Sequence, residues 1–488
     1  MEKPGTVPIT RLTSGVQKLD DILGGGWPEF SFNLIVGEPG SGKTTLAHQL
    51  MFANATPDRR ALYFTVLGEP TIKMLRYQQQ FAFFDMAKIG TAIHFANLSA
   101  EALANDLGAV LDAIMARITE LEPAIVIVDS FRTLVPATTV EGALSLQEFV
   151  QRLAMNLTTW QATTFLLGEY PASQIGANPL STLADGLLVM SQQVSRNSMV
   201  RQIQVQKMRG NSPQPGLHTI RISAEGVRAF PRMLKPIEDN QAAVTGELIS
   251  TGIAGLDDML GGGTWRGNAM LIAGPVGSGK STAAIQFLAE GARRGEPGVL
   301  VIFEETKPKY LDQARSFGIN LDALVTQGLL EVIYVRPLDL SMDETLYEIE
   351  AAVDRSHARR IVLDSISGLE AALAPAFKAD FLESLYRLLG ALTGVGITIL
   401  LTVEVSESYN DFRFTPHPIS FLTHDIVLQR YYEAEGELRS FMTVVKARAR
   451  KHSRELRRYE LTAQGIVVHE KLQQYRGIIT AVPSNRPG

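Results

Sequence analysis

The chain has 488 residues, of which 45% are hydrophobic and 20% are charged, and its formal net charge is −5. This composition excludes global disorder, and the length allows two or three domains that each bury a core. The acidic balance gives no general attraction to nucleic acid, and the absence of cysteine excludes disulfides and thiolate metal sites.

Targeting signals are the next feature that the sequence bounds. The first residues, MEKPGTVPIT, lack the apolar core of a signal peptide. No apolar run reaches the roughly 18 residues that a membrane helix needs. A chain without cysteine also fits a reducing compartment. We therefore expect a cytoplasmic protein that has no membrane as a partner.

An internal repeat organises the chain. TSGVQKLDDILGGGW in the first half returns as STGIAGLDDMLGGGTW in the second, and IVIVDS returns as IVLDS. Lys43 and Lys280, in equivalent glycine-rich loops, are 237 positions apart. The spacing predicts two domain-sized repeats, 1–237 and 238–488, whose seam lies in the polar stretch Lys235–Glu247.

Within each repeat, short apolar runs alternate with amphipathic stretches such as the helix predicted over Leu107–Leu121. Strands that alternate with helices indicate a parallel sheet with helices on both faces. The predicted fold class is therefore α/β, with two tandem domains that each hold a mostly parallel sheet.

A phosphate-binding motif, G-x-x-x-x-G-K-[ST], occupies the same place in both repeats as GEPGSGKT and GPVGSGKS. Its glycines let backbone N–H groups turn toward phosphate oxygens, its lysine reaches the outer phosphates, and the following hydroxyl can bind Mg²⁺. A glycine-rich turn without function is the alternative, which two matches at equivalent places disfavour. We predict two sites for ATP with Mg²⁺. The predicted nucleotide-binding residues are Gly37, Gly40, Ser41, Gly42, Lys43, Thr44 and Thr45, and Gly274, Gly277, Ser278, Gly279, Lys280, Ser281 and Thr282, with both lysines also assigned to catalysis.

The stretch IFEET places Glu304 and Glu305 directly after a buried apolar run. A carboxylate near the γ-phosphate can orient or deprotonate the attacking water or hydroxyl. We predict that Glu304 is the general base and Glu305 its support; a pair of solvated strand-end acids is the alternative. In the first repeat, TVLGEPT keeps at most one of these acids, Glu69, followed by Pro70. The sequence leaves open whether the first site hydrolyses ATP or only holds it.

Further acids end apolar strands downstream of the loops. Asp129 and Asp364 lie where P-loop proteins place the residue that holds the water shell of the metal. A helix cap is the alternative for one such residue, but the recurrence favours the metal role. The predicted Mg²⁺-binding residues are Thr44, Asp129, Ser281 and Asp364. Glu169 and Glu404 also end strands and could either sense the γ-phosphate or bind across a subunit interface.

Together these residues resemble the KaiC family of tandem RecA-like ATPases. The resemblance covers nearly the whole chain: both LDD-x-LGGG segments, both P-loops, the FEET of the second half, both VDS/LDS strands and KMRG. It implies two RecA-like domains and a two-tiered homo-hexameric ring with nucleotide sites between subunits. It also implies ATP hydrolysis in the first tier and phosphorylation of a neighbouring subunit in the second.

The resemblance further implies cations supplied in trans. Lys207 and Arg209 resemble a K-x-R pair that reaches the triphosphate of the neighbour, with Arg201 as a companion. Lys446 and Arg448 fill these places in the second repeat. Such a cation stabilises charge on the transferring phosphoryl group and links turnover to ring assembly. A solvated basic strand face is the alternative.

The segment PISFLTHDI departs from the family pattern, because the family's adjacent Ser-Thr pair aligns with Ser420 and Phe421. The predicted autophosphorylation site is Ser420, with Thr423 as the second candidate. The lost threonine, together with an end at Gly488 that leaves no long tail for a KaiA-type regulator, predicts a KaiC-like protein that is not a circadian clock member.

The predicted function is a Mg²⁺-dependent ATPase and serine/threonine autokinase that acts in signal transduction or slow timing, with a signalling protein as a further partner. A nucleic-acid motor is the first alternative, supported by the basic run Lys446–Arg458 but disfavoured by the acidic net charge and the lack of an aromatic-basic stacking platform. A non-catalytic nucleotide-gated scaffold is the second, supported by the irregular TVLGEPT.

Overall fold

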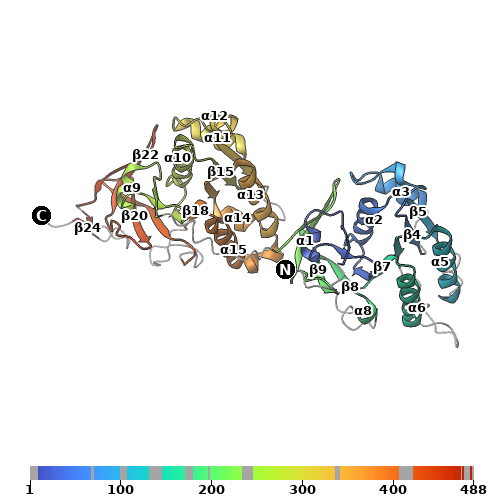
Figure 1. The fold of residues 1–488 in the computed structure, drawn as a ribbon. Coiled ribbons are helices and arrows are strands. Elements are labelled where there is room, and N and C mark those ends of the chain that lie inside the picture. Colours follow the sequence, from blue (N-terminus) through green and yellow to red (C-terminus); the bar gives the residue numbers. More distant parts are fainter. Residues whose placement is uncertain are drawn as a thin grey trace. The chain divides into compact units, whose positions relative to one another are not determined.

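The computed structural model of the chain describes residues 9–66, 71–98, 107–130, 146–170, 180–195, 198–232, 246–335, 341–405, 421–473, 475–476 and 484–485. The chain divides into two compact units, Met1–Arg232 and Met233–Gly488 (Figure 1). Within the described residues, no helix combines the length and the apolarity that crossing a bilayer requires.

A nine-stranded mixed sheet forms the centre of the first unit. Its strands are β3 (Phe32–Gly37), β4 (Ala61–Thr65), β5 (Ile93–Asn97), β6 (Ile125–Asp129), β7 (Thr163–Glu169), β8 (Gly186–Ser195), β9 (Ser198–Met208), β10 (His218–Ser223) and β11 (Gly226–Phe230). They follow the order β11-β10-β9-β8-β3-β7-β6-β4-β5. The pairs from β8 to β5 are parallel, and β9, β10 and β11 extend the sheet with antiparallel pairs.

Helices and short strands complete the first unit. The helices are α1 (Leu19–Leu23), α2 (Lys43–Asn54), α3 (Thr71–Gln78), the 3-10 helix η1 (Met86–Lys88), α5 (Leu107–Leu121), α6 (Leu146–Thr159) and α8 (Leu180–Leu183). A two-residue strand β1 (Arg11–Leu12) pairs with β2 (Trp27–Pro28). The helix predicted over Leu107–Leu121 is confirmed with the same bounds as α5.

The second unit repeats the sheet of the first strand for strand. Its strands are β14 (Ala269–Gly274), β15 (Gly298–Ile302), β16 (Leu330–Tyr334), β17 (Arg360–Asp364), β18 (Thr398–Glu404), β19 (Asp425–Ala434), β20 (Glu437–Ala447), β21 (Arg457–Thr462) and β22 (Gly465–Lys471). Their order is β16-β15-β17-β18-β14-β19-β20-β21-β22. Strand β14 lies between β18 and β19 as β3 lies between β7 and β8, so the sequence repeat is a repeat of topology.

The helices of the second unit are α9 (Ala254–Leu260), α10 (Lys280–Arg293), α11 (Lys307–Ser316), α12 (Leu321–Thr326), α13 (Met342–Ser356), α14 (Ile366–Ala372), the 3-10 helix η4 (Pro375–Asp380) and α15 (Phe381–Gly394). Two-residue strands pair as β12 (Leu248–Ile249) with β13 (Thr264–Trp265), and as β23 (Tyr475–Arg476) with β24 (Ser484–Asn485).

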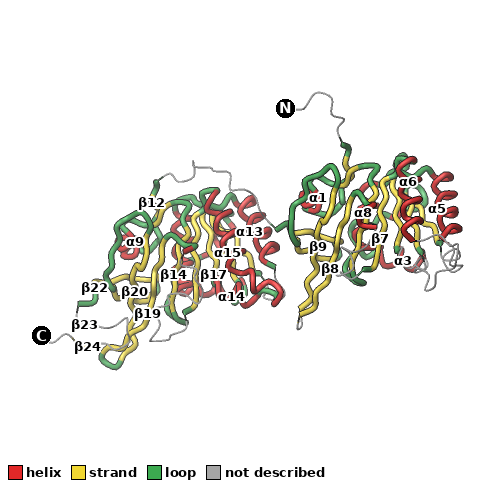
Figure 2. The backbone as a smooth tube through the Cα atoms, turned by 90° about the horizontal axis from the view of Figure 1, so that it is seen from below, coloured by secondary structure: helices red, strands yellow, loops and turns green. Residues whose placement is uncertain are grey.

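Both faces of each sheet are covered, which explains the apolar strands. In β3 the side chain of Ile35 packs into one core cluster, whereas those of Leu34 and Val36 pack into another. Successive side chains of a strand point to opposite faces, so a strand buried on both sides reads as a continuous apolar run. Figure 2 shows helices beside the strands of each unit. The predicted α/β class with two mostly parallel sheets is thus confirmed.

A buried histidine distinguishes the first unit from the second. His48 of α2 is fully buried and stacks on Tyr63, with 4.6 Å between ring centroids. Neither of its ring nitrogens hydrogen-bonds any described residue. Burial lowers the pKa of the His48 imidazole to about 3, so the ring is neutral in the folded chain. The equivalent position of α10, 237 residues later, holds Ile285.

We predict that His48 makes the first unit sensitive to acid. The unfolded chain binds a proton at this imidazole below about pH 6.5, whereas the folded unit excludes it until about pH 3. Stability is therefore lost as the pH falls through this window, by up to about 1.4 kcal/mol per pH unit. His48→Leu should flatten this loss, which denaturant unfolding of the full chain between about pH 7 and about pH 5 measures.

The transition of the second unit serves as the internal control, because an apolar side chain holds the equivalent place there. The prediction would be contradicted if the free energy of unfolding of the first unit fell equally with pH in the wild-type chain and in His48→Leu.

Candidate nucleotide sites

In each unit the glycine-rich loop connects the central parallel strand to the following helix. Strand β3 ends at Gly37 and α2 begins at Lys43, while β14 ends at Gly274 and α10 begins at Lys280. Each loop turns through left-handed glycines that a side chain would strain. Their φ angles are 77° at Gly40, 104° at Gly42, 78° at Gly277 and 91° at Gly279. The two predicted loops thus form matching turns, each at the start of a long helix.

The lysine of each loop folds back onto the loop itself. Lys43 Nζ donates to the carbonyls of Gly37 and Glu38, each at 2.9 Å. Lys280 Nζ donates to the carbonyl of Gly274 at 2.9 Å and to that of Pro275 at 2.7 Å. Burial is the main cause that lowers the pKa of both lysines. A buried or partly buried ammonium group that donates to main-chain carbonyls is well suited to receive phosphate oxygens.

Different residues brace the two loops from the antiparallel side of the sheet. In the second unit, Tyr431 Oη donates to the carbonyl of Val276 at 3.0 Å and Tyr459 Oη to that of Ser278 at 2.6 Å. In the first unit, Arg201 Nε donates to the carbonyl of Gly40 at 3.0 Å. Arg201, predicted to act in trans, therefore contacts the P-loop of its own chain.

In the first unit the two predicted metal-binding groups lie together. Thr44 Oγ1 donates to Asp129 Oδ2 at 2.8 Å, and Tyr63 Oη donates to the same oxygen at 2.6 Å. Burial raises the pKa of Asp129, and the hydrogen bonds from Tyr63 and Thr44 act against this rise. A hydroxyl and a carboxylate at this distance offer the oxygen ligands that Mg²⁺ prefers.

In the second unit a tyrosine joins the equivalent groups. Tyr310 Oη donates to Asp364 Oδ2 at 2.7 Å, and Thr402 Oγ1 donates to the other carboxylate oxygen. The neighbouring side chain of Ser281 acts in the lowering direction on the pKa of Tyr310, against burial and Asp364, which raise it. The two predicted metal-binding residues, Ser281 and Asp364, thus both lie beside the phenol of Tyr310.

Neither tyrosine stands out in the sequence as a site residue. Tyr63 comes from β4, where the second repeat has Leu300, and Tyr310 comes from α11, where the first repeat has Met74 when TVLGEPT is shifted by one residue. Burial and the neighbouring aspartate raise the pKa of both phenols, so each remains a donor. Because the two tyrosines do not share a position in the repeat, comparing the halves could not reveal them.

A cavity of about 220 Å³ gathers the predicted catalytic groups of the second unit. Among its lining residues are Lys280, Ser281, Glu304, Glu305, Asp364 and Glu404. They come from four neighbouring parallel strands or from the segments that directly follow them. The carboxyl ends of parallel strands meet at one edge of the sheet, which explains the convergence.

The two glutamates of IFEET have different partners. Glu304 Oε1 accepts a hydrogen bond from Ser365 Oγ at 2.6 Å. Glu305 instead pairs with Lys309, one helical turn later, at 2.9 Å, and its side chain is 36% exposed. The i,i+4 spacing in EETKPK was the signal for this second contact. Both acids line the cavity and Glu304 is exposed, but the carboxylate of Glu304 is hydrogen-bonded to the start of α14, whereas that of Glu305 is paired with its own helix.

The strand-end acids Glu169 and Glu404 lie beside the first glycine of each loop. Glu169 is in register with Gly37, and Glu404 with Gly274. After burial, the charge of this glutamate is the largest influence on the pKa of the loop lysine in each unit, which it raises.

The K-x-R pairs bind main-chain carbonyls and a carboxylate of their own chain. Lys207 Nζ donates to the carbonyl of Thr182 at 3.1 Å, and Arg209 pairs with Asp185 at 3.0 Å. Lys446 Nζ donates to the carbonyl of Thr423 at 2.7 Å, and Arg448 to that of Phe421 at 3.2 Å. In both units the pair therefore holds the segment that leads into the strand next to the P-loop strand.

Two other predicted residues, Glu69 and Ser420, lie outside the described residues. The second phosphorylation candidate, Thr423, is fully buried, and its hydroxyl has no hydrogen-bond partner in the described part of the chain. Phosphoryl transfer to Thr423 would require the surrounding packing to open.

Carboxylates pair with three of the seven Lys and Arg residues in the run Lys446–Arg458. Arg450 is buried against Asp425 at 2.8 Å. Arg457 pairs with Glu455, and Arg458 with Glu460. A nucleic-acid groove needs cations that are available to phosphates, so this geometry does not add support for a motor.

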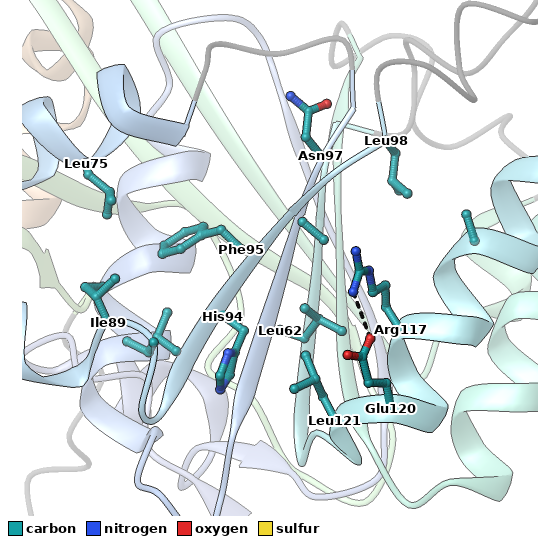
Figure 3. Close-up of a pocket in the computed structure, with 14 residues that line it drawn as sticks. Leu62, Leu75, Ile89, His94, Phe95, Asn97, Leu98, Arg117, Glu120 and Leu121 are labelled. Atoms are coloured by element: carbon teal, nitrogen blue, oxygen red, sulfur yellow. Dashed lines mark hydrogen bonds and ion pairs between the residues drawn. The ribbon is translucent and has the colours of Figure 1, made fainter.

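A second cavity, of about 580 Å³, follows the edge strand β5. Figure 3 shows Phe95 of that strand on the side of Leu75, whereas the ion pair between Arg117 and Glu120 of α5 lies across the strand. That ion pair is largely exposed, and the residues that line the cavity include none of the predicted site residues. The described contacts give this cavity no chemistry of its own.

Comparison with known proteins covers both units. The family model described as "ATPase: KaiC" matches residues 12–233 and 249–473. The circadian clock oscillator protein KaiC of Parathermosynechococcus lividus is 25% identical over 98% of this chain and 88% of its own length. The proteins of the same name from Picosynechococcus and Nostoc are each 25% identical over 98% of this chain, and over 93% and 92% of their own lengths. Since the matched segments carry both P-loops, the chain belongs to the KaiC family of ATPases.

Proposed function

We propose that the chain binds Mg²⁺ and ATP at both P-loops, hydrolyses ATP and phosphorylates itself on serine or threonine through its second unit. We place it in the cytoplasm, as a homo-hexameric ring that serves signal transduction or slow timing with a partner protein. The observation that carries this proposal is the convergence of Lys280, Asp364 and Glu304 on one cavity. A cation, a metal-binding carboxylate and a base at one place are the groups that phosphoryl transfer needs.

Binding begins at the loops. The backbone N–H groups of the glycine turns and the helix starts would hold the phosphates. Lys43 and Lys280 would exchange their loop carbonyls for outer phosphate oxygens. When bound, Mg²⁺ would supply positive charge that offsets the negative charge of the phosphates. Thr44 with Asp129, and Ser281 with Asp364, are the residues that would hold it and its water shell.

Glu304 is the proposed base of the second unit, with Glu305 as its support. Its carboxylate takes the proton of the attacking hydroxyl, from water in hydrolysis or from Ser420 of a neighbouring subunit in autophosphorylation. The new bond joins that oxygen to the γ-phosphorus, and the bond from the γ-phosphorus to the β–γ bridging oxygen breaks to release ADP. Glu69 is the proposed acid of the first unit, where the rate of hydrolysis is an outcome of the tests below.

The proposed ring places Lys446 and Arg448, and Lys207 and Arg209, against the triphosphate of the next subunit, with Arg201 beside them. These side chains hold carbonyls or a carboxylate of their own chain. Assembly would exchange these contacts for charge-assisted bonds to phosphate, which are stronger. Turnover would then depend on the neighbour.

The proposed kinase assignment is tested by incubating the full chain with γ-labelled ATP and mapping the labelled peptides. We expect label between Phe414 and Asp425 and its loss in Lys280→Ala, because the ammonium group that holds the outer phosphates is gone. Lys43→Ala should weaken ring assembly, measured as mass in solution with nucleotide. Lys18→Ala, on the surface of the first unit, is the control.

Label outside this peptide, or label that survives Lys280→Ala, would refute the kinase assignment. Release of phosphate without label on the protein would support ATP hydrolysis and contradict autophosphorylation.

Subunit mixing tests the proposed cations in trans. Lys446→Ala keeps its P-loop but lacks the cation that acts in trans, and Lys280→Ala keeps its K-x-R pair but lacks the P-loop lysine. Each variant alone should therefore be inactive in the second unit. A mixture should regain phosphorylation, because some interfaces then combine an intact P-loop with an intact cation. A mixture no more active than its components, or a wild-type chain that turns ATP over at full rate as a monomer, would contradict the ring.

The tyrosines give a third prediction. Tyr310→Phe and Tyr63→Phe remove a donor from the metal-binding aspartate, whose orientation then loosens. The Mg²⁺ concentration for half-maximal turnover should rise by about tenfold or more. Tyr386→Phe, at an exposed phenol of α15, is the matched control. An unchanged Mg²⁺ requirement in both site variants would show that the phenols do not position the carboxylates.

A further inference from the structure

Among the described residues, one hydroxyl is hydrogen-bonded to the carboxylate of Glu304. Ser365 Oγ, which is buried, donates to Glu304 Oε1 at 2.6 Å. The same oxygen accepts the N–H of Gly368 at 2.9 Å, as the N-cap of α14. Because that N–H occupies the acceptor side of the serine oxygen, the hydroxyl proton points to the glutamate. The hydrogen bond therefore has a fixed direction.

The side chain of Glu304 packs directly against the backbone of Gly368. A Cβ built at Gly368 would lie 2.7 Å from both Cγ and Oε1 of Glu304. That separation is well inside van der Waals contact, so the glutamate side chain rests directly on the first turn of α14. Alanine at this position would displace the carboxylate while leaving the hydroxyl of Ser365 in place.

The same turn also holds a second acid of the cavity. Ser367 Oγ accepts the backbone N–H of Glu404 at 3.2 Å. The residues that follow the metal-binding Asp364 thus fix the side chain of one acid and the main chain of another. Glu305 has no part in this arrangement, since it pairs with Lys309.

We infer that Ser365 is a positioning residue for the base of the second unit, and that residue 368 must be glycine for this base to reach its working pose. The inference rests on the proposed function, because it concerns the step in which Glu304 accepts a proton. With Oε1 held by Ser365, the second carboxylate oxygen is left for the attacking hydroxyl. A base that is held in one rotamer loses less activity to misplacement than a free one.

The experiment measures turnover and nucleotide affinity separately. The share of ATP turnover that Lys280→Ala removes from the full chain defines the activity of the second site. In Ser365→Ala and in Gly368→Ala this share should fall by about tenfold to a hundredfold, while the dissociation constant for Mg·ADP stays within about twofold. Ser365→Thr keeps the donor and should restore most of the activity.

Two matched controls separate positioning from helix stability. Ser341→Ala removes the N-cap serine of α13, which accepts from the N–H of Glu344 at 3.1 Å, and should leave turnover unchanged. Gly255→Ala adds a methyl group to a helical glycine of α9, where it meets Val468 instead of Glu304. It should also leave turnover unchanged.

A double substitution provides the sharpest readout. In a Glu304→Gln background, Ser365→Ala should cause no further loss, because the base that it positions is already absent. Equal losses in both backgrounds, a parallel loss of nucleotide affinity, or wild-type turnover in Ser365→Ala and Gly368→Ala would each overturn the inference. If Lys280→Ala removes no turnover and no phosphorylation, the proposed function fails. That failure is read from Lys280→Ala, so it is distinguishable from a failure of the inference, which is read from the variants at Ser365 and Gly368.

Discussion

The chemistry of this chain depends on one constraint: a buried carboxylate must stand beside a lysine at the carboxyl edge of a parallel sheet. Strand register brings the carboxylates to this edge, since Ile302 lies opposite Asp364 and Gly274 opposite Glu404. The loop after β14 brings the lysine, Lys280, to the same edge. A carboxylate buried there without donors would be costly. The phenol of Tyr310 and the hydroxyl of Thr402 remove that cost.

The two units reach this arrangement by different side chains on one topology. A phenol from β4 holds Asp129, whereas a phenol from α11 holds Asp364. The first P-loop is braced by Arg201, and the second by Tyr431 and Tyr459. The sheet and loop are therefore fixed more strictly than the groups that support them. Such freedom allows one unit to specialise in holding nucleotide and the other in phosphoryl transfer without a change of fold.

The parts that sequence analysis predicted are those that local chemistry encodes. The P-loops follow from glycine spacing, the strands from continuous apolar runs, and the helix Leu107–Leu121 from its amphipathic pattern. The contacts of Tyr310 and Ser365 could not be read in this way, because each joins residues more than 50 positions apart through the sheet. Arg201 shows the same limit, since its position in β9 does not reveal that it lies over Gly40 of its own loop.

In the proposed ring, the K-x-R pairs would connect the site to assembly. In both units their cations bind the segment just before the strand beside the P-loop strand, which in the second unit follows Ser420 directly. Moving these cations to the phosphates of a neighbour would therefore remove the hydrogen bonds to the carbonyls of Phe421 and Thr423, which directly precede β19. A triphosphate that draws the cations away would thereby release the start of β19 in the subunit that donates them. The nucleotide bound by one subunit and the anchoring of the strand beside the P-loop strand in the next would then depend on the same cations.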